Sequence, residues 1–522
     1  MWRQFSKYAE STGGQIARQL GAYVVLANLP FWIAGHSLIT KPRAPLNVDY
    51  LIAGILCLFL PRAAGIALLA GDVLADVFAN AAASFYFSAD ELIASVKYAV
   101  QLPLQRILVI GLAVLCSSVG FAMLVSRAAG SPSVRNRRPV AALLCGLLLP
   151  LTGMRLFYRL RDIDLHPIAG SPSRHLLIAA WNSRGFSDQR LDQAAVIPSA
   201  TGPLMAHLNG NSGVSAHGSA SLTGMPIEQY NIVLVLVESY GLMRDAEGAA
   251  ALEAPFHEQA AMDRYEVETG AVAFSGPTVS GEFRELCGVQ AGIGSTQIAA
   301  AISARCLPAL LKDRGYETTA IHGYFGAMFD RWIWYPEIGF QRMEFLEDLR
   351  THPGMHICGP AMPGICDVDI GDWLDQALTS RAIGKPRFIY WLTLNSHWPI
   401  AALPEDAALF ACDSPHAANP DPSICHWMAL IYKVNRAIEK LSTDPRLPLT
   451  QFIIVGDHAP PFLTEARRNQ FSQAEVPFIR LLPRSPRENS SRSASNARAG
   501  NKRQVSSPLA GLRELHNPIK SK

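Results

Sequence analysis

Charged residues are scarce in this chain. Asp, Glu, Lys and Arg make up 17% of its 522 residues, and the mean hydropathy is +0.14. Soluble domains carry about 25% charged residues, so this composition argues against a wholly soluble protein and indicates a membrane part. No internal repeat stands out, and no small-residue cleavage site follows the first apolar run, so we do not interpret that run as a removable signal peptide.

Long apolar runs dominate the first 158 residues and predict a transmembrane domain of about five helices. The candidate spans lie near residues 20–40, 49–61, 63–86, 105–126 and 138–157. A helix needs about 20 residues to cross a bilayer, so the second and third runs, separated by Pro61, are the weakest. Four spans is one alternative, and a large soluble helical domain is the other.

Short basic segments predict the orientation of these spans. Basic residues precede the first span and lie between the last two: Arg3, Lys7, Arg18, Arg127, Arg135, Arg137 and Arg138. Loops enriched in Lys and Arg stay in the cytoplasm. With five spans, everything after residue 158 lies outside it.

The rest of the chain divides into a connector, an α/β domain and a tail. Residues 159–228 are rich in Ser, Gly, Ala and His, which predicts a juxtamembrane connector, helical around 176–181 and flexible around 210–224. Residues 484–522 hold nine Lys or Arg and two Glu, which predicts a basic disordered tail. Between them, residues 229–483 alternate apolar strand candidates with helical segments, the pattern of a mostly parallel central sheet flanked by helices. The strand candidates are 232–237, 271–274, 317–321, 387–394 and 452–455.

Six cysteines fall in this exported part, and three in the apolar third. In an oxidising compartment an even number suggests disulfides, and six cysteines allow about 15 pairings. We favour pairs between sequence neighbours, although buried thiols stay possible. These pairs are Cys287 with Cys306, Cys358 with Cys366, and Cys412 with Cys425.

Two apolar strands end in metal-ligand residues. The run 232–237 is followed by Glu238, and the run 452–455, after Gly456, by Asp457 and His458. In open α/β sheets ligands gather outside the carboxyl ends of the strands, so these side chains should converge. With the Thr278 hydroxyl they form a mixed O/N set that suits one divalent ion, Mn²⁺ or Zn²⁺.

A turn rich in Gly and Pro between residues 275 and 281 offers three hydroxyls: Ser275, Thr278 and Ser280. A hydroxyl is a poor nucleophile at its own pKa, so it needs a neighbouring base or a metal ion. The predicted metal set would supply one.

Five short motifs resemble, in their order along the chain, those of lipoteichoic acid synthases. More broadly, they are similar to membrane-anchored phosphoglycerol and phosphoethanolamine transferases of the alkaline phosphatase/sulfatase superfamily. The likeness covers roughly half the chain. The motifs are Leu-Val-Glu-Ser-Tyr (236–240), Thr-Val-Ser-Gly-Glu-Phe (278–283), His-Gly-Tyr (322–324), Leu-Asn-Ser-His-Trp-Pro (394–399) and Gly-Asp-His (456–458).

The resemblance assigns roles within these motifs. It implies Thr278 as the nucleophile, ahead of Ser280 and Ser275, and His397 as a residue that binds substrate phosphate or handles the leaving group's proton. Arg331 could offer a planar fork for phosphate oxygens, and His322 either binds substrate or lies buried beneath the site.

The implied function is a metal-dependent phosphotransferase in a bacterial inner membrane, with its catalytic domain on the periplasmic or extracellular side. It would move the head group of phosphatidylglycerol or phosphatidylethanolamine to an envelope glycan or lipid through a phosphoryl-Thr intermediate, without nucleic acid as a partner. The motif at 278–283 leans toward phosphoglycerol. A sulfatase needs Cys or Ser followed by x-Pro-x-Arg, and Val279 replaces that Arg, so we rank sulfatase lower. A lipid-binding relative without catalysis is the other alternative.

Overall fold

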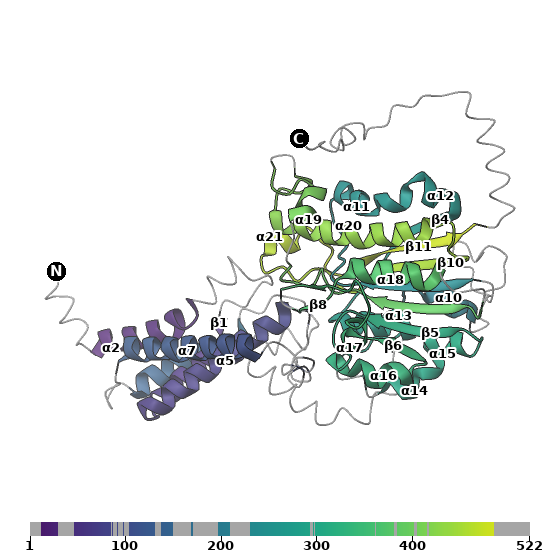
Figure 1. Ribbon diagram of the computed structural model, residues 1–522. Coiled ribbons are helices and arrows are strands. Elements are labelled where there is room, and N and C mark those ends of the chain that lie inside the picture. Colours follow the sequence, from purple (N-terminus) through teal and green to yellow (C-terminus); the bar gives the residue numbers. More distant parts are fainter. Residues whose placement is uncertain are drawn as a thin grey trace.

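A computed structural model describes most of the α/β domain and parts of the N-terminal region (Figure 1). The described residues are 12–29, 46–84, 104–130, 137–149, 197–208 and 230–484, with short gaps in the last range at 293–295, 297, 361, 380–383, 401–403 and 415–416. Residues 86, 91, 95, 98, 169 and 170 are described singly or as a pair. The predictions for the helix at 176–181, the flexible stretch at 210–224 and the tail after 484 lie outside the described residues.

Helices make up most of the described N-terminal region. They are α2 (Thr12–Leu20), η1 (Gly21–Leu26), α4 (Val48–Cys57), α5 (Arg62–Ser84), α7 (Leu104–Ala129) and a helix over 137–149. Helix therefore occurs at each of the five predicted spans. Within the part of the chain that the structure describes, however, one stretch is long and apolar enough to cross a membrane, Gly111–Ala129 of α7. The expected five-span bundle is not confirmed.

A seven-stranded sheet forms the centre of the α/β domain (Figure 1). Its order is β4-β11-β10-β3-β9-β5-β6, and the five strands from β10 to β6 are parallel. β11 runs antiparallel to both of its neighbours, so the sheet is mixed, in keeping with the expectation of a mostly parallel sheet. The bounds are β3 (Asn231–Val237), β4 (Tyr265–Ala273), β5 (Glu317–His322), β6 (Arg342–Glu344), β9 (Arg387–Leu392), β10 (Thr450–Gly456) and β11 (Glu475–Pro483).

Successive residues of β3 feed two separate hydrophobic cores. Ile232, Leu234 and Leu236 belong to one core, whereas Val233 and Val235 belong to the other. Side chains of a strand point alternately to opposite faces, so a strand covered on both sides must be apolar throughout. This explains the continuous apolar run that the sequence shows.

Helices cover both faces of the sheet (Figure 1). One core includes side chains of α10 (Gly202–Leu208), α13 (Thr278–Cys287), α15 (Leu307–Lys312) and α16 (Arg331–Glu337). The other includes side chains of α11 (Ala246–Glu253), α18 (Asp367–Thr379) and α20 (Pro422–Thr443). The remaining helices of the domain are α12 (Gln259–Arg264), α14 (Ala299–Ile302), α17 (Leu346–Leu349), α19 (Pro404–Leu409) and α21 (Glu465–Arg468).

Part of the predicted connector belongs to the packed domain. Residues 197–208 carry α10, whose Leu204, Met205 and Leu208 lie in the first core. The backbone N–H of Thr201 donates to Glu285 Oε2 at 3.1 Å. These residues therefore pack as an early element of the α/β domain, which the weak periodicity of the region did not indicate.

The three favoured disulfides are confirmed. Cys287 pairs with Cys306, Cys358 with Cys366, and Cys412 with Cys425. The first joins the last residue of α13 to the residue that precedes α15. The helix that begins with Thr278 is thus covalently tied at its other end.

Candidate active site

Glu238 and Asp457 lie side by side because their strands are neighbours in register. In the parallel pair β3 and β10, Val237 lies opposite Gly456, so the next residue of each strand emerges at the same edge. The Asp457 N–H donates to the Val237 carbonyl at 3.2 Å and extends the pairing by one residue. Gly456 is required here, because a Cβ at this position would collide with the Tyr240 carbonyl.

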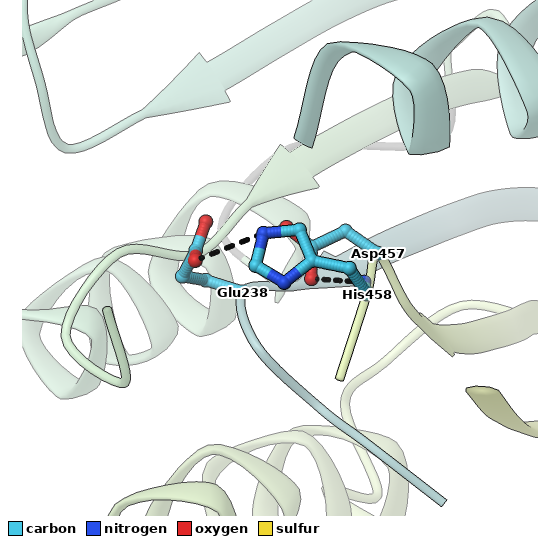
Figure 2. A group of neighbouring side chains, drawn as sticks. All are labelled: Glu238, Asp457 and His458. Carbon is cyan, nitrogen blue, oxygen red and sulfur yellow. Dashed lines mark hydrogen bonds and ion pairs between the residues drawn. The ribbon is translucent and has the colours of Figure 1, made fainter. Parts of the chain in front are cut away.

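The predicted metal ligands form one compact cluster (Figure 2). Glu238, Asp457 and His458 each offer a ligand atom, and these atoms all lie within 4.8 Å of one another. His458 Nε2 is 3.6 Å from Glu238 Oε1 and 3.4 Å from Asp457 Oδ2. All three residues are buried.

Hydrogen bonds on their outer sides orient His458 and Asp457 toward the centre of the cluster. His458 Nδ1 lies 2.9 Å from the Ala459 carbonyl, so Nδ1 carries a proton and Nε2 is the ring nitrogen that can offer a lone pair to an ion in the cluster. Asp457 Oδ1 accepts the backbone N–H groups of Ser239 and His458 at 2.7 and 2.6 Å. Asp457 Oδ2 is buried without a hydrogen-bond partner among the described residues. An unpartnered carboxylate oxygen facing an imidazole lone pair is a donor set that fits a divalent cation.

The charges in the cluster reinforce this interpretation. Burial, together with the neighbouring Glu238 carboxylate, raises the pKa of Asp457 to about 7. Burial alone would lower the pKa of His458, but the two carboxylates outweigh it and raise that pKa. Two buried carboxylates in one site repel each other, and a divalent cation removes that cost.

Among the hydroxyl residues of the 275–281 turn, Thr278 contacts the cluster. As first residue of α13, it donates from Oγ1 to Glu238 Oε2 at 3.1 Å and lies 3.5 Å from His458 Nε2. Ser275 Oγ instead accepts from Gln290 Nε2 at 3.1 Å. The N-terminus of a helix favours negative charge, so this position suits both an ionising hydroxyl and a phosphate group.

Arg284 connects α13 to the loop that carries the ligands. Its guanidinium donates to the carbonyls of Gly456 and Asp457 at 2.5 and 3.2 Å and pairs with Glu285 at 2.6 Å. The side chain is 2% exposed. Arg284 was not predicted from the sequence, where its only signal was a pair of charged residues inside a helix that is buried along its whole length.

The close approach of α13 to Asp457 yields a first prediction. A Cβ at Gly281 would lie 3.0 Å from Asp457 Cβ and 3.1 Å from its Cα, so Gly281→Ala must push α13 away from the ligand loop. We expect divalent-metal affinity to fall about 10-fold or more, the usual range for disturbed ligand support. Isothermal titration with Mn²⁺ measures it. Ser280→Ala, one residue earlier and without such a clash, is the control, and equal affinities for the two variants would contradict the prediction.

Asp367 holds the loop that contains His397. It begins α18, and its carboxylate accepts the backbone N–H groups of Leu394 and Asn395 at 3.0 and 2.7 Å. Asn395 Oδ1 in turn accepts the Asp367 N–H at 2.7 Å. The sequence offered no signal for this residue beyond its place directly after Cys366.

A pH-dependent stability follows from Asp367. Burial raises its pKa from 3.8 to about 7. The folded protein therefore holds this proton more tightly than the unfolded chain, so the contribution to stability is complete below about pH 4 and is lost as the pH rises through 7. We expect the thermal midpoint to fall between pH 5 and pH 8 by more in the wild type than in Asp367→Asn, which cannot ionise there. Circular dichroism melts test this, and parallel pH profiles would refute it.

His397 lies on this loop and has an unpartnered nitrogen. Its Nδ1 is buried without a hydrogen-bond partner among the described residues. Burial and the charge of His458 lower its pKa to about 4, so the ring is neutral at pH 7. It is connected to the cluster through the loop, since Ser396 Oγ donates to the Glu238 carbonyl.

The structure does not bring Arg331 and His322 to the cluster as open substrate-binding groups. Arg331 donates from Nε and Nη2 to the buried Glu282 carboxylate at 3.2 and 3.0 Å, and 2% of its side chain is exposed. His322 ends β5, where Nδ1 lies 3.0 Å from the Leu392 carbonyl. Burial lowers the pKa of His322 well below its ordinary value, so it is a neutral, hydrogen-bonded histidine.

The salt bridge between Arg331 and Glu282 could not be predicted from the sequence, because the two residues are distant along the chain.

Comparisons with solved structures find partial similarities at low sequence identity. A lipoteichoic acid synthase, LtaP from Listeria monocytogenes, is 14% identical over 53% of this chain and 71% of its own, with a TM-score of 0.38. The phosphoglycerol transferase GacH of Streptococcus pyogenes, in complex with sn-glycerol-1-phosphate, is 12% identical over 56% and 76%, with a TM-score of 0.36. The periplasmic domain of EptC from Escherichia coli, in complex with Zn, is 14% identical over 51% and 76%, with a TM-score of 0.35.

The sequence itself matches a defined protein family. Residues 230–507, more than half of the chain, match the sulfatase family. A comparison with the curated proteins, in contrast, finds no match. The range that matches the family contains the whole cluster and Thr278, and the chain therefore belongs to the sulfatase family.

Proposed function

We propose that the protein is a membrane-anchored, metal-dependent phosphotransferase that moves the head group of a phospholipid to an envelope glycan or lipid. The observation that carries this proposal is the position of the Thr278 hydroxyl, 3.1 Å from one ligand carboxylate and 3.5 Å from the ligand imidazole. A hydroxyl beside a carboxylate and an imidazole can lose its proton and act as a nucleophile. The sulfatase alternative would need Ser275 as the modified residue, and its hydroxyl bonds to Gln290 instead.

Glu238, Asp457, His458 and Thr278 would hold the ion. When bound, a divalent ion acts as a Lewis acid that lowers the pKa of a nearby hydroxyl and neutralises phosphoryl charge. Mn²⁺ and Zn²⁺ both accept this mixture of carboxylate, imidazole and hydroxyl ligands.

The chain's own residues would carry a two-step displacement. In the first step Thr278 Oγ1 loses its proton toward Glu238, forms a bond to phosphorus, and the P–O bond to diacylglycerol breaks, with the departing oxygen protonated by water. In the second step an acceptor hydroxyl gives its proton to the hydroxide left from the first step and attacks phosphorus, the bond from phosphorus to Thr278 Oγ1 breaks, and Oγ1 takes its proton back from Glu238. A neutral His397 suits hydrogen bonding to a phosphoryl oxygen better than proton donation, because its pKa is lowered to about 4.

Exposed apolar side chains on the N-terminal helices support membrane anchoring. On α7, Leu108, Leu112 and Leu115 follow one another at helical spacing and are 60, 62 and 46% exposed. A continuous apolar stripe of this kind is rare on a soluble surface and is what a lipid-facing helix needs. Anchoring would keep the site close to a lipid donor. The outer side of a bacterial inner membrane, where the three disulfides could form, is the location we propose.

The decisive experiment is head-group release by the full-length protein in phospholipid vesicles. Vesicles with labelled phosphatidylglycerol or phosphatidylethanolamine and Mn²⁺ should yield diacylglycerol, and phosphatidylglycerol is the donor we favour. Mass spectrometry of glycans and lipids from a deletion strain would then identify the acceptor. No release from either lipid would overturn the proposal. Purification without stoichiometric metal would favour a non-catalytic relative.

A further inference from the structure

A tyrosine from the N-terminal region lies against the metal cluster. Tyr86 follows α5 by two residues, yet its ring centroid is 5.6 Å from that of the ligand His458, with an angle of 37° between the planes. Its other neighbours come from different loops of the α/β domain. Phe274, one residue before the turn that carries Thr278, packs edge-on at 5.3 Å. Tyr86 thus bridges the ligand side and the nucleophile side of the site.

Polar contacts fix the Tyr86 ring in this place. Its hydroxyl donates to Gln473 Oε1 at 3.1 Å, and Gln473 Nε2 donates to the Arg468 carbonyl at 3.0 Å. The Arg468 guanidinium lies 5.8 Å from the ring centroid, within the range of a cation–π contact. The Tyr86 side chain is half-buried in this position.

Two further residues of the same stretch contact the same edge of the sheet. Glu91 lies against the nucleophile turn, since a Cβ at Gly276 would be 3.6 Å from Glu91 Oε1, and one at Gly292 would collide with that carboxylate. Tyr98 donates its hydroxyl to Asp330 Oδ2 at 2.7 Å and packs edge-on against Phe329 at 5.2 Å. Tyr98 is 4% exposed, so this is a packed contact.

We propose that the N-terminal region completes the active site, with Tyr86 as a positioning residue for His458 and as a wall of the substrate site. The Tyr86 ring limits rotation of the imidazole and excludes water from its outer side, which strengthens a metal ligand. Together with Phe274 it gives the organic part of a phosphodiester an apolar surface beside Thr278. The assignment of a lipid as substrate rests on the proposed function, whereas the metal-positioning role does not.

The test compares Tyr86→Ala with Tyr86→Phe in the full-length protein. Phenylalanine keeps the ring and removes only the hydroxyl, so it is the matched control. For Tyr86→Ala we expect a loss of Mn²⁺ affinity of about 10-fold by calorimetry, together with a raised KM for the lipid donor. Tyr86→Phe should stay close to the wild type in both measurements. Circular dichroism confirms that each variant is folded. Trp332→Ala, which removes an exposed aromatic side chain outside the cluster, controls for the general loss of an aromatic residue.

The readouts separate this inference from the proposed function. Mn²⁺ affinity and hydrolysis of a soluble phosphodiester, bis(p-nitrophenyl) phosphate, do not require a lipid donor. If the wild type released no diacylglycerol but Tyr86→Ala still weakened Mn²⁺ binding, the transferase proposal would fail and the positioning role would stand. Unchanged Mn²⁺ affinity and unchanged KM in Tyr86→Ala would overturn the inference.

Discussion

Replacing Thr278 by alanine is expected to abolish head-group transfer. The substitution removes the hydroxyl of the turn that contacts Glu238 and His458, and the loss of a covalent nucleophile costs on the order of 10³-fold or more in kcat. Folding should be unaffected, because the α13 backbone and its neighbours keep their contacts. Release of labelled diacylglycerol from vesicles measures the effect.

Thr278→Ser is the matched control for that experiment. Serine keeps a hydroxyl on Cβ and should retain measurable transfer, whereas Ser280→Ala and Ser275→Ala should behave like the wild type. Mass spectrometry of the protein after a brief incubation with lipid should find the head-group phosphate on the peptide with Thr278. Transfer by Thr278→Ala at the wild-type rate would exclude Thr278 as the nucleophile.

Replacing Asp457 by asparagine is expected to remove both metal binding and activity. Asp457 Oδ2 is the unpartnered oxygen that faces His458 Nε2, and an amide in its place lacks the negative charge that a divalent ion needs. In the wild type, Mn²⁺ at about 100 times its Kd should stabilise the fold by about 2.7 kcal/mol. We expect a clear rise in melting temperature for the wild type and none for Asp457→Asn.

The chelated proteins should show the opposite order of stability. Without an ion, burial and Glu238 raise the pKa of Asp457 to about 7, so above that pH the wild type retains two buried, mutually repelling carboxylates. Asp457→Asn relieves this repulsion. In EDTA at pH 8 we therefore expect the variant to melt at or above the temperature of the wild type. A Mn²⁺-dependent rise in the variant equal to that of the wild type would contradict the assignment of Asp457 as a ligand.

The sequence predicted those parts of the site that depend on strand ends. Glu238 and Asp457 each follow an apolar strand. Because the carboxyl ends of neighbouring parallel strands meet at one edge of the sheet, this pattern predicts that the two side chains lie close together. The three disulfides were also predicted, since their cysteines are near in sequence and short loops close easily. These features are local, or follow from one simple rule of topology.

The sequence did not reveal contacts that depend on packing between distant elements. Arg331 has a guanidinium that could bind phosphate, but it forms a buried salt bridge with Glu282 of α13 instead. The short strand β6 has no periodic pattern of its own and is recognised only beside β5. Tyr86 lies far from residue 458 along the chain and acquires its place through the docking of the N-terminal region. Contacts between residues so distant along the chain can be recognised only in the tertiary structure.

The guanidinium of Arg284 ties the helix that begins with Thr278 to the loop that carries Asp457 and His458. It grips the carbonyls of Gly456 and Asp457 from the helix that begins with Thr278. If this helix shifted, these hydrogen bonds would favour a matching shift of the loop that carries Asp457 and His458. The distance between the Thr278 hydroxyl and that loop therefore depends on one buried, charged side chain.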